Sequence, residues 1–301
     1  MMLSPASQRL LAQWPVTPGQ VWQCGSHRVM CGDATDLHHV VQLMDGQPWR
    51  CLCTSPPYLS RRHYQQRITD WQALALGFME AAMLWAAPDS DALVNLGLIY
   101  EHRRVVRYWE PWLDACEARG WPLFGWYVWD KLSGFPGNHY GRLAPTHEWL
   151  FHFQQGSTQA QAWIATKTPG ARRSMTSSVR DPNGQMRHFT SSQPVGQYKV
   201  PDSVLRIPRY SVLRIPRYMR RRSGGDFHPA MQAQEFQAAI LYTWSQPDDV
   251  VYDPFGGSGQ TLLTAHALGR RCVIMDIAPV YVALMLQRWL DVTGELPRRL
   301  Q

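Results

Sequence analysis

The sequence predicts an α/β fold in which a largely parallel sheet carries helices on both faces. Short apolar runs alternate with stretches of helical apolar spacing in the first half of the chain and again after residue 226, which is the pattern of strand–helix–strand units. A glycine-rich turn at residues 255–259 lies between an expected strand and an expected helix. With 45% hydrophobic residues, the 301-residue chain can bury one large core.

The expected elements follow this alternation along the chain. In the first half we expect strands at residues 49–54, 92–96, 123–129 and 147–153, and a helix at residues 71–87. Near the end we expect helices at residues 230–243, 259–268 and 279–289, and strands at residues 250–252 and 272–275. The second group is a strand, glycine-rich turn, helix and strand unit of the Rossmann kind.

Residues 156–226 interrupt the pattern. This segment holds 13 Lys and Arg residues against 3 Asp and Glu residues, although the whole chain has a net charge of only +7. A concentrated positive segment attracts polyanions such as nucleic acid, and a solvated, partly disordered loop is the alternative. The segment also contains a perfect tandem octapeptide, SVLRIPRY, at residues 203–210 and 211–218. A duplication that lengthens a loop is a simpler explanation than a doubled DNA-contacting hairpin.

The composition argues against several classes of protein. No stretch approaches the roughly 18 apolar residues of a membrane span. Residues 1–14 lack the pattern of a secretory signal, so we expect a cytoplasmic protein. The six cysteines lack the paired C-x-x-C spacing of zinc or redox sites. We therefore expect buried thiols and no metal site.

A candidate cofactor-binding turn follows the expected strand at residues 250–252. Its residues are Asp253, Pro254, Phe255, Gly256, Gly257, Ser258 and Gly259. Glycines let the backbone approach a ligand closely, and the helix N-terminus offers unpaired N–H groups. Asp276 ends the next strand, where an acidic side chain accepts hydrogen bonds from ribose hydroxyls. We expect a cofactor that contains adenosine, with NAD as the rival, although Leu262 replaces the third glycine of the G-x-G-x-x-G pattern.

A second candidate site directly follows the strand at residues 49–54. It consists of Thr54, Ser55, Pro56, Pro57 and Tyr58. The two prolines make the turn rigid and leave backbone carbonyls without competing N–H neighbours, so these acceptors suit an amino group. An exocyclic amine that donates both N–H groups localises its lone pair and can attack a sulfonium methyl group. The tyrosine could stack on a base that has left the duplex. A proline-rich turn that only caps the strand is the alternative.

Together the two sites resemble those of the beta group of DNA amino-methyltransferases, which act on cytosine N4 or adenine N6. In that group an S/D/N-P-P-Y motif precedes the target-recognition region, and an F-x-G-x-G motif follows it, as they do here. Residues 27–33, 128–131, 146–151 and 228–229 resemble its G-D, W-D-K, H-E-x-L-x-F and H-P elements. The chain departs from the group at residues 230–233, where T-x-K-P is usual, and at residues 278–279, where an acidic residue usually precedes proline.

The resemblance implies a Rossmann-like methyltransferase fold with permuted motif order. Residues 1–155 would form the catalytic half, residues 156–226 an inserted target-recognition region, and residues 227–301 the cofactor-binding half. S-adenosylmethionine would be the cofactor, and Ser55, Pro56, Pro57 and Tyr58 would be the catalytic residues. The cofactor contacts would be Asp33, Thr54, Asp253, Pro254, Phe255, Gly257, Ser258, Gly259 and Asp276. Arg206, Arg209, Arg214, Arg217, Arg220, Arg221 and Arg222 would contact DNA.

The resemblance also implies double-stranded DNA as the partner. It leaves open a cognate restriction endonuclease and the choice between a monomer and a homodimer. Serine at the first motif position favours cytosine N4, with adenine N6 as the alternative because hydroxyl, amide and carboxylate groups all accept from an amine. A C5-cytosine enzyme needs a cysteine nucleophile, and the chain has no Pro-Cys dipeptide. A nicotinamide-dependent dehydrogenase and a catalytically inactive DNA-binding protein are the alternatives from other classes.

Overall fold

The computed structural model describes the chain except for residues 1–3, 59–68, 133–138, 140, 208–233 and 301. The chain divides into two compact units. Met1–Thr158 and Ser203–Gln301 form the main unit, and Gln159–Asp202 form a second unit, which we call the insert unit.

The main unit is built on a ten-stranded sheet with the order β13-β7-β8-β4-β3-β14-β15-β2-β1-β16. Its strands are β1 (Val21–Cys24), β2 (His27–Cys31), β3 (Trp49–Thr54), β4 (Ala86–Leu96), β7 (Leu123–Asp130), β8 (His147–Gln155), β13 (Val204–Arg206), β14 (Val250–Asp253), β15 (Arg271–Asp276) and β16 (Arg298–Arg299). The five strands from β4 to β2 run parallel, whereas β8 pairs antiparallel with β4 and β7. The carboxyl ends of these five parallel strands therefore meet at one edge of the sheet.

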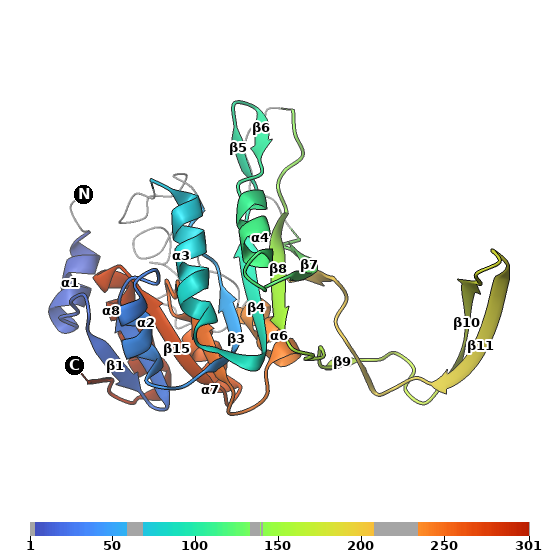
Figure 1. Ribbon diagram of the computed structural model, residues 1–301. Helices are drawn as coiled ribbons and strands as arrows, with labels where there is room; N and C mark the ends of the chain where they lie inside the picture. Colours follow the sequence, from blue (N-terminus) through green and yellow to red (C-terminus); the bar gives the residue numbers. More distant parts are fainter. Residues whose placement is uncertain (1–3, 59–68, 133–138, 140, 208–233, 301) are drawn as a thin grey trace. The chain divides into compact units, whose positions relative to one another are not determined.

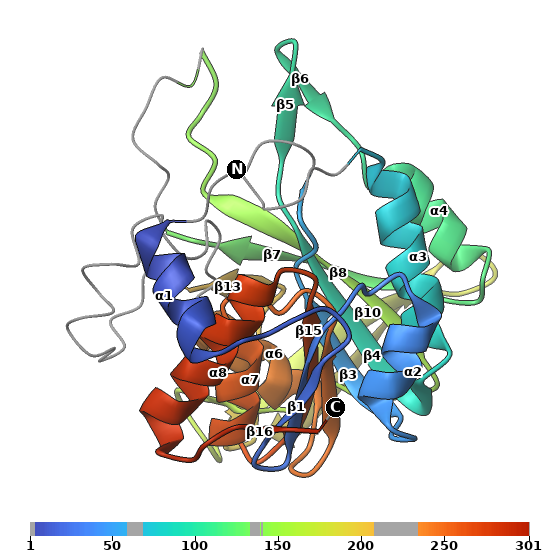
Figure 2. The ribbon, with the colours of Figure 1, turned by 90° about the vertical axis from the view of Figure 1, so that its left-hand side faces the viewer.

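Helices cover both faces of this sheet (Figures 1 and 2). One face carries α1 (Pro5–Gln13), α6 (Gln234–Trp244), α7 (Gln260–Ala267) and α8 (Pro279–Thr293). The other face carries α2 (Leu37–Met44), α3 (Trp71–Met83) and α4 (Glu110–Glu117). A small hairpin of β5 (Ile99–Glu101) and β6 (Arg104–Val106) follows β4. The predicted α/β fold, with a mostly parallel sheet between two helical layers, is confirmed.

The central strands carry long apolar runs because both of their faces are buried. In β3, Cys51 and Cys53 belong to the core on the side of α6, α7 and α8. The intervening Leu52 belongs to the core on the side of α2, α3 and α4. This two-sided burial is the reason why parallel strands show continuous apolar runs rather than alternation.

Two expected elements have different limits in the structure. The helix expected at residues 71–87 ends at Met83, because β4 already begins at Ala86. The first residues of β4 are partly polar, so apolar spacing does not reveal where the strand begins. Asp91 is nevertheless buried in this part of β4, where it pairs with His152 of β8. The helix expected from residue 230 is described from Gln234 onward, and residues 230–233 lie outside the described residues.

The insert unit contains strands that the apolar pattern of the sequence does not predict. Strands β10 (Arg172–Arg180) and β11 (Met186–Pro194) form a nine-residue antiparallel hairpin, and β9 (Ile164–Ala165) pairs with β12 (Tyr198–Lys199). The hairpin turn is held by Asp181, whose Oδ1 accepts hydrogen bonds from the backbone N–H groups of Asn183 and Gln185. Gly184 adopts the left-handed conformation (φ 79°) that completes the turn.

The first octapeptide enters the sheet of the main unit. Val204, Leu205 and Arg206 form β13, which pairs in parallel with β7, and Leu205 packs against the core. The second octapeptide lies outside the described residues. So do six of the seven arginines predicted to contact DNA, namely Arg209, Arg214, Arg217, Arg220, Arg221 and Arg222. Within the described residues, no helix has the length and apolar character needed to cross a membrane.

Candidate active site

The glycine-rich turn lies where β14 passes into α7, at the carboxyl edge of the sheet. Gly257 and Gly259 both have positive φ angles, of 50° and 74°, so side chains there would strain the backbone. Gly256 has a different reason to be glycine, because a Cβ atom would lie 2.4 Å from Cγ1 of Ile274. Phe255 packs edge-on against Phe78 of α3, with ring centroids 5.1 Å apart.

Asp253, the last residue of β14, joins the two candidate sites. Its Oδ1 accepts a hydrogen bond from Thr54 Oγ1 at 2.7 Å and another from the Phe255 N–H at 3.1 Å. Its Oδ2 accepts from Thr261 Oγ1 of α7 at 2.6 Å. Burial raises the pKa of Asp253 to about 6, while these three hydrogen bonds oppose the shift. Both Asp253 and Thr54 are buried, so their side chains position the two turns relative to each other.

Asp276 ends β15, beside the glycine-rich turn. Its Oδ2 accepts from the Gly257 N–H at 3.0 Å, and its Oδ1 accepts from the Ala278 N–H at 2.9 Å. Burial raises the pKa of Asp276 to about 6, and the two backbone hydrogen bonds lower it in part. The carboxylate is thus held at the edge of the sheet in a fixed orientation. Such a group can accept the two hydroxyls of a ribose.

Asp33 follows β2, the neighbour of β15. The backbone N–H of Gly32 donates to the Asp276 carbonyl at 3.0 Å, which places Asp33 beside the end of β15. Asp33 Oδ1 accepts hydrogen bonds from both the N–H and the hydroxyl of Thr35, at 2.9 and 2.8 Å. The side chain therefore stabilises its own turn, and the contribution of Asp33 to a cofactor site stays a prediction.

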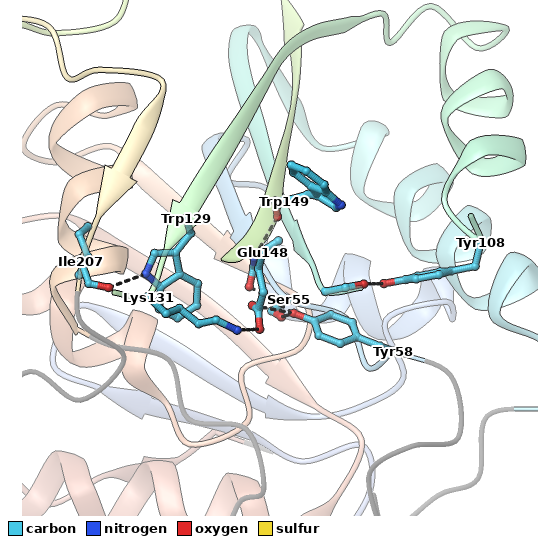
Figure 3. Close-up of polar contacts among 10 residues, drawn as sticks. Ser55, Tyr58, Tyr108, Trp129, Lys131, Glu148, Trp149 and Ile207 are labelled. Atoms are coloured by element: carbon cyan, nitrogen blue, oxygen red, sulfur yellow. Dashed lines mark hydrogen bonds and ion pairs between the residues drawn. The ribbon is translucent and has the colours of Figure 1, made fainter. Parts of the chain in front are cut away.

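The S-P-P-Y turn continues from β3 and is anchored on both sides. Pro56 is buried, and the Pro57 carbonyl accepts from Trp71 Nε1 of α3 at 3.1 Å. The Tyr58 hydroxyl lies 2.9 Å from Ser55 Oγ, and the tyrosine ring lies against Gly97 at the end of β4. A Cβ atom on Gly97 would be only 2.8 Å from the ring. The motif is thus a closed turn in which the serine and tyrosine hydroxyls meet (Figure 3).

Among the described residues, two further side chains contact this turn and a third pairs with one of them; the sequence motifs gave none of the three a role. The Tyr58 hydroxyl donates toward Asn95 Oδ1 of β4 at 3.2 Å and toward Glu148 Oε2 of β8 at 3.4 Å. Glu148 Oε1 in turn pairs with Lys131 Nζ at 3.0 Å (Figure 3). Lys131 and Glu148 fall within the W-D-K and H-E-x-L-x-F elements, so the family resemblance was the signal that could have identified them.

Comparison with known proteins identifies the family of this chain. The model of the N6/N4 DNA methylase family matches residues 50–287, which span both candidate sites. This chain belongs to the DNA methylase family. The methylase is similar to the type II methyltransferase M.SmaI of Serratia marcescens, with 22% identity over 300 residues that cover 87% of this chain and 90% of that protein.

Solved structures show that the methylase shares its fold with other DNA methyltransferases. The PvuII DNA methyltransferase, described as cytosine-N4-specific, aligns with a TM-score of 0.64 and 19% identity over 92% of each chain. A DNA modification methylase from Thermus thermophilus, solved in complex with S-adenosyl-L-methionine, aligns with a TM-score of 0.53 and 18% identity. That alignment covers 89% of this chain and 96% of the other. The predicted methyltransferase fold is confirmed.

Proposed function

We propose that this DNA methylase transfers a methyl group from S-adenosylmethionine to the N4 amino group of cytosine in double-stranded DNA. The observation that carries the proposal is the hydrogen bond from Thr54 to Asp253, which joins the S-P-P-Y turn to the glycine-rich turn at the ends of adjacent parallel strands. A cofactor on one turn and an amine on the other would be neighbours. Proximity of that kind is a large part of catalysis when two substrates must meet.

The residues at the carboxyl edge fit S-adenosylmethionine. We propose that the Asp276 carboxylate binds the ribose hydroxyls, and that Phe255, Gly257, Ser258 and Gly259 line the path of the cofactor. Asp253, Pro254 and Thr54 are buried, and the hydrogen bonds of Asp253 to Thr54 and to the Phe255 N–H hold this turn in place. S-adenosylmethionine is the methyl donor, and it supplies a methyl group bound to a positively charged sulfur.

The S-P-P-Y turn provides what a flipped cytosine needs. Ser55 Oγ and the Pro56 carbonyl would accept the two N–H groups of the amine, which localises its lone pair toward the methyl group. Tyr58 would hold the base by stacking, in a position fixed by its contact with Gly97.

Cytosine N4 is favoured over adenine N6 by two observations. Ser55 occupies the first motif position, and the fold is similar to that of a methyltransferase described as cytosine-N4-specific. Methylation at C5 is disfavoured because it needs a reactive thiolate. Cys53 is the cysteine nearest to the motif in sequence, but it is buried and donates to Gln237 Oε1 at 2.7 Å. Burial also raises its pKa well above the usual value.

Mass spectrometry of nucleosides from DNA methylated by the purified protein tests the proposal. We expect N4-methylcytosine. N6-methyladenine would retain the mechanism at the S-P-P-Y turn but overturn the choice of base. 5-Methylcytosine would overturn the mechanism as well, because a covalent cysteine intermediate would then be required.

We expect the affinity for S-adenosylmethionine to rise with pH and to level off above about pH 7. The pKa of Asp276 is raised to about 6, so the carboxyl group is protonated below that pH and accepts ribose hydroxyls poorly. Each pH unit below 6 should weaken binding by up to about tenfold, since a proton must leave on binding. Calorimetry between pH 5 and pH 8 provides the measurement.

The Asp276→Asn variant is the control for this pH dependence. We expect weaker binding, by roughly 1 to 3 kcal/mol, and a flatter pH profile. A wild-type profile that does not change across pH 6, or an Asp276→Asn variant that binds like the wild type, would remove Asp276 from the cofactor site. Asp253 has the same raised pKa of about 6, so an unchanged slope in the variant would indicate Asp253 instead.

We propose that the insert unit and the basic segment after it contact DNA. The insert unit has six Lys and Arg residues against two Asp residues, and the side chains described on both strands of its long hairpin are exposed. Replacing Arg220, Arg221 and Arg222 with alanine should weaken DNA binding and reduce the dependence of affinity on salt, because each lost phosphate contact lowers the number of released counterions. Fluorescence anisotropy at several salt concentrations measures both quantities. Replacing Arg9 and Arg298, which lie far from this segment in sequence, provides a control.

A further inference from the structure

The hydroxyl groups of Ser55 and Tyr58 form a chain whose direction can be deduced from their neighbours. The distance between Ser55 Oγ and Tyr58 Oη is 2.9 Å, and either oxygen could donate the proton. Only one direction leaves both lone pairs of the serine oxygen available to a substrate amine. The direction therefore matters for the proposed function, on which this inference rests.

Asn95 meets the tyrosine as a hydrogen-bond acceptor. Its Nδ2 donates to the Trp149 carbonyl at 2.9 Å, which fixes the orientation of the amide group. The Oδ1 atom therefore points to the Tyr58 hydroxyl, at 3.2 Å. Asn95 is buried, so this orientation does not depend on solvent.

Glu148 also meets the tyrosine as an acceptor. Its Oε1 atom is 3.0 Å from the Lys131 ammonium group, and its Oε2 atom is 3.4 Å from the Tyr58 hydroxyl. The side chains of both charged residues are about nine-tenths buried, with 8% and 11% exposed. An ionised carboxylate has no proton to donate, and its ammonium partner compensates the buried charge.

Two acceptors thus compete for the single proton of the Tyr58 hydroxyl. The Tyr58 hydroxyl therefore donates its hydrogen bond to Asn95 or Glu148. Its oxygen is then left to accept a hydrogen bond from the Ser55 hydroxyl. Ser55 Oγ then presents lone pairs only. In the opposite direction the Ser55 proton would point at the substrate and could bind the amine lone pair that must attack the methyl group.

We propose that Glu148, held by Lys131, is a positioning residue that acts with Asn95 to set the direction of the Tyr58–Ser55 hydrogen bond and so makes Ser55 an acceptor for the substrate amine. Glu148 acts through Tyr58 and Ser55. It belongs to β8, far in sequence from both the S-P-P-Y turn and the glycine-rich turn (Figure 3).

The Glu148→Gln variant tests the proposal, because an amide of the same shape can donate to Tyr58 and so removes one of the two acceptors that direct the Tyr58 proton away from Ser55. We expect single-turnover methylation of unmethylated plasmid DNA to slow by at least about tenfold, with affinities for S-adenosylmethionine and DNA within about twofold of the wild type. In a Ser55→Ala background the same substitution should have little further effect. This non-additivity is the signature of residues that act as one unit.

Asp91→Asn is the matched control. Asp91 is another buried carboxylate, on β4, and its Oδ1 pairs with His152 of β8 at 2.8 Å. This pair is in the same strands as Asn95 and Glu148 but does not involve the S-P-P-Y turn. We expect Asp91→Asn to lower the thermal midpoint without changing the rate of methyl transfer in the folded protein.

Tyr58→Phe provides a second variant if Glu148→Gln does not fold, because it removes the hydroxyl and leaves the buried ion pair in place. It should slow methyl transfer, again with little further loss in the Ser55→Ala background. Wild-type rates of methyl transfer in Glu148→Gln or Tyr58→Phe would overturn the proposal. If Ser55→Ala were slow in the same experiments, the acceptor role of Ser55 in the proposed function would still be supported. Additive losses would show that Glu148 is only structural. A fully active Ser55→Ala variant would overturn this proposal together with the acceptor role proposed for Ser55, and the methylated nucleoside would still identify the base.

Discussion

Replacing Ser55 with alanine should lower the single-turnover rate of DNA methylation by about 100-fold or more. The serine oxygen is proposed to accept an N–H of the amine, and this interaction strengthens as the nitrogen becomes tetrahedral in the transition state. The affinities for S-adenosylmethionine and DNA should change little, because the cofactor turn is separate and the phosphate contacts remain. Rapid-quench incorporation of labelled methyl groups, with calorimetry of cofactor binding, provides the measurement.

Ser90→Ala serves as the control for this substitution. Ser90 is a buried serine of β4, and within the described part of the chain its hydroxyl has no hydrogen-bond partner. The control should methylate DNA at the wild-type rate. A Ser55→Ala variant that loses cofactor affinity in proportion to its rate would indicate a structural effect on the turn and would contradict the acceptor role.

Replacing Asp253 with alanine should destabilise the folded protein by roughly 3 kcal/mol or more. The change removes the acceptor of three hydrogen bonds, from Thr54, Thr261 and the Phe255 N–H, and leaves the two threonine hydroxyls buried without this acceptor. Because Asp253 connects the two turns, the variant should also lose both cofactor affinity and activity. Urea denaturation, followed by circular dichroism, gives the change in unfolding free energy.

Two conservative variants make the Asp253 prediction more specific. Thr54→Val and Thr261→Val each remove one of the donors while keeping the side-chain shape, and each should cost about 1 kcal/mol. We expect Thr54→Val to affect methylation more strongly, because Thr54 directly precedes Ser55. Unfolding free energies of Asp253→Ala and wild type that agree within about 0.5 kcal/mol would contradict a stabilising role for this bridge.

The sequence predicts both the parallel sheet and the proximity of the S-P-P-Y turn to the glycine-rich turn, because both follow from the buried strands. Buried parallel strands are recognisable as apolar runs, and residues that follow such strands must gather at one edge. Thr54 and Asp253 are 199 residues apart, yet both end a strand of this kind. Their direct hydrogen bond could not be predicted, because it depends on β3 and β14 being neighbours in the sheet.

The hairpin of the insert unit cannot be recognised from apolar alternation, because the side chains described on its two strands are exposed. Val179, Met186 and Phe189 are all at least half exposed, so no alternation of buried and exposed residues marks the strands. The D-P-N-G sequence of its turn, at residues 181–184, was the available signal. Likewise, Glu148 reaches Tyr58 only through the antiparallel placement of β8 beside β4, which local sequence does not specify.

The six cysteines can be used to follow local unfolding of the protein. All six thiols are buried and unpaired by disulfides, and burial raises the pKa of Cys31 and Cys116 to about 12. Alkylating reagents react with the thiolate, so the native protein should resist them at neutral pH. Labelling followed by peptide mass spectrometry would then time the exposure of individual strands, with Cys53 reporting on the strand that leads to the S-P-P-Y turn and Cys272 on the strand that leads to Asp276.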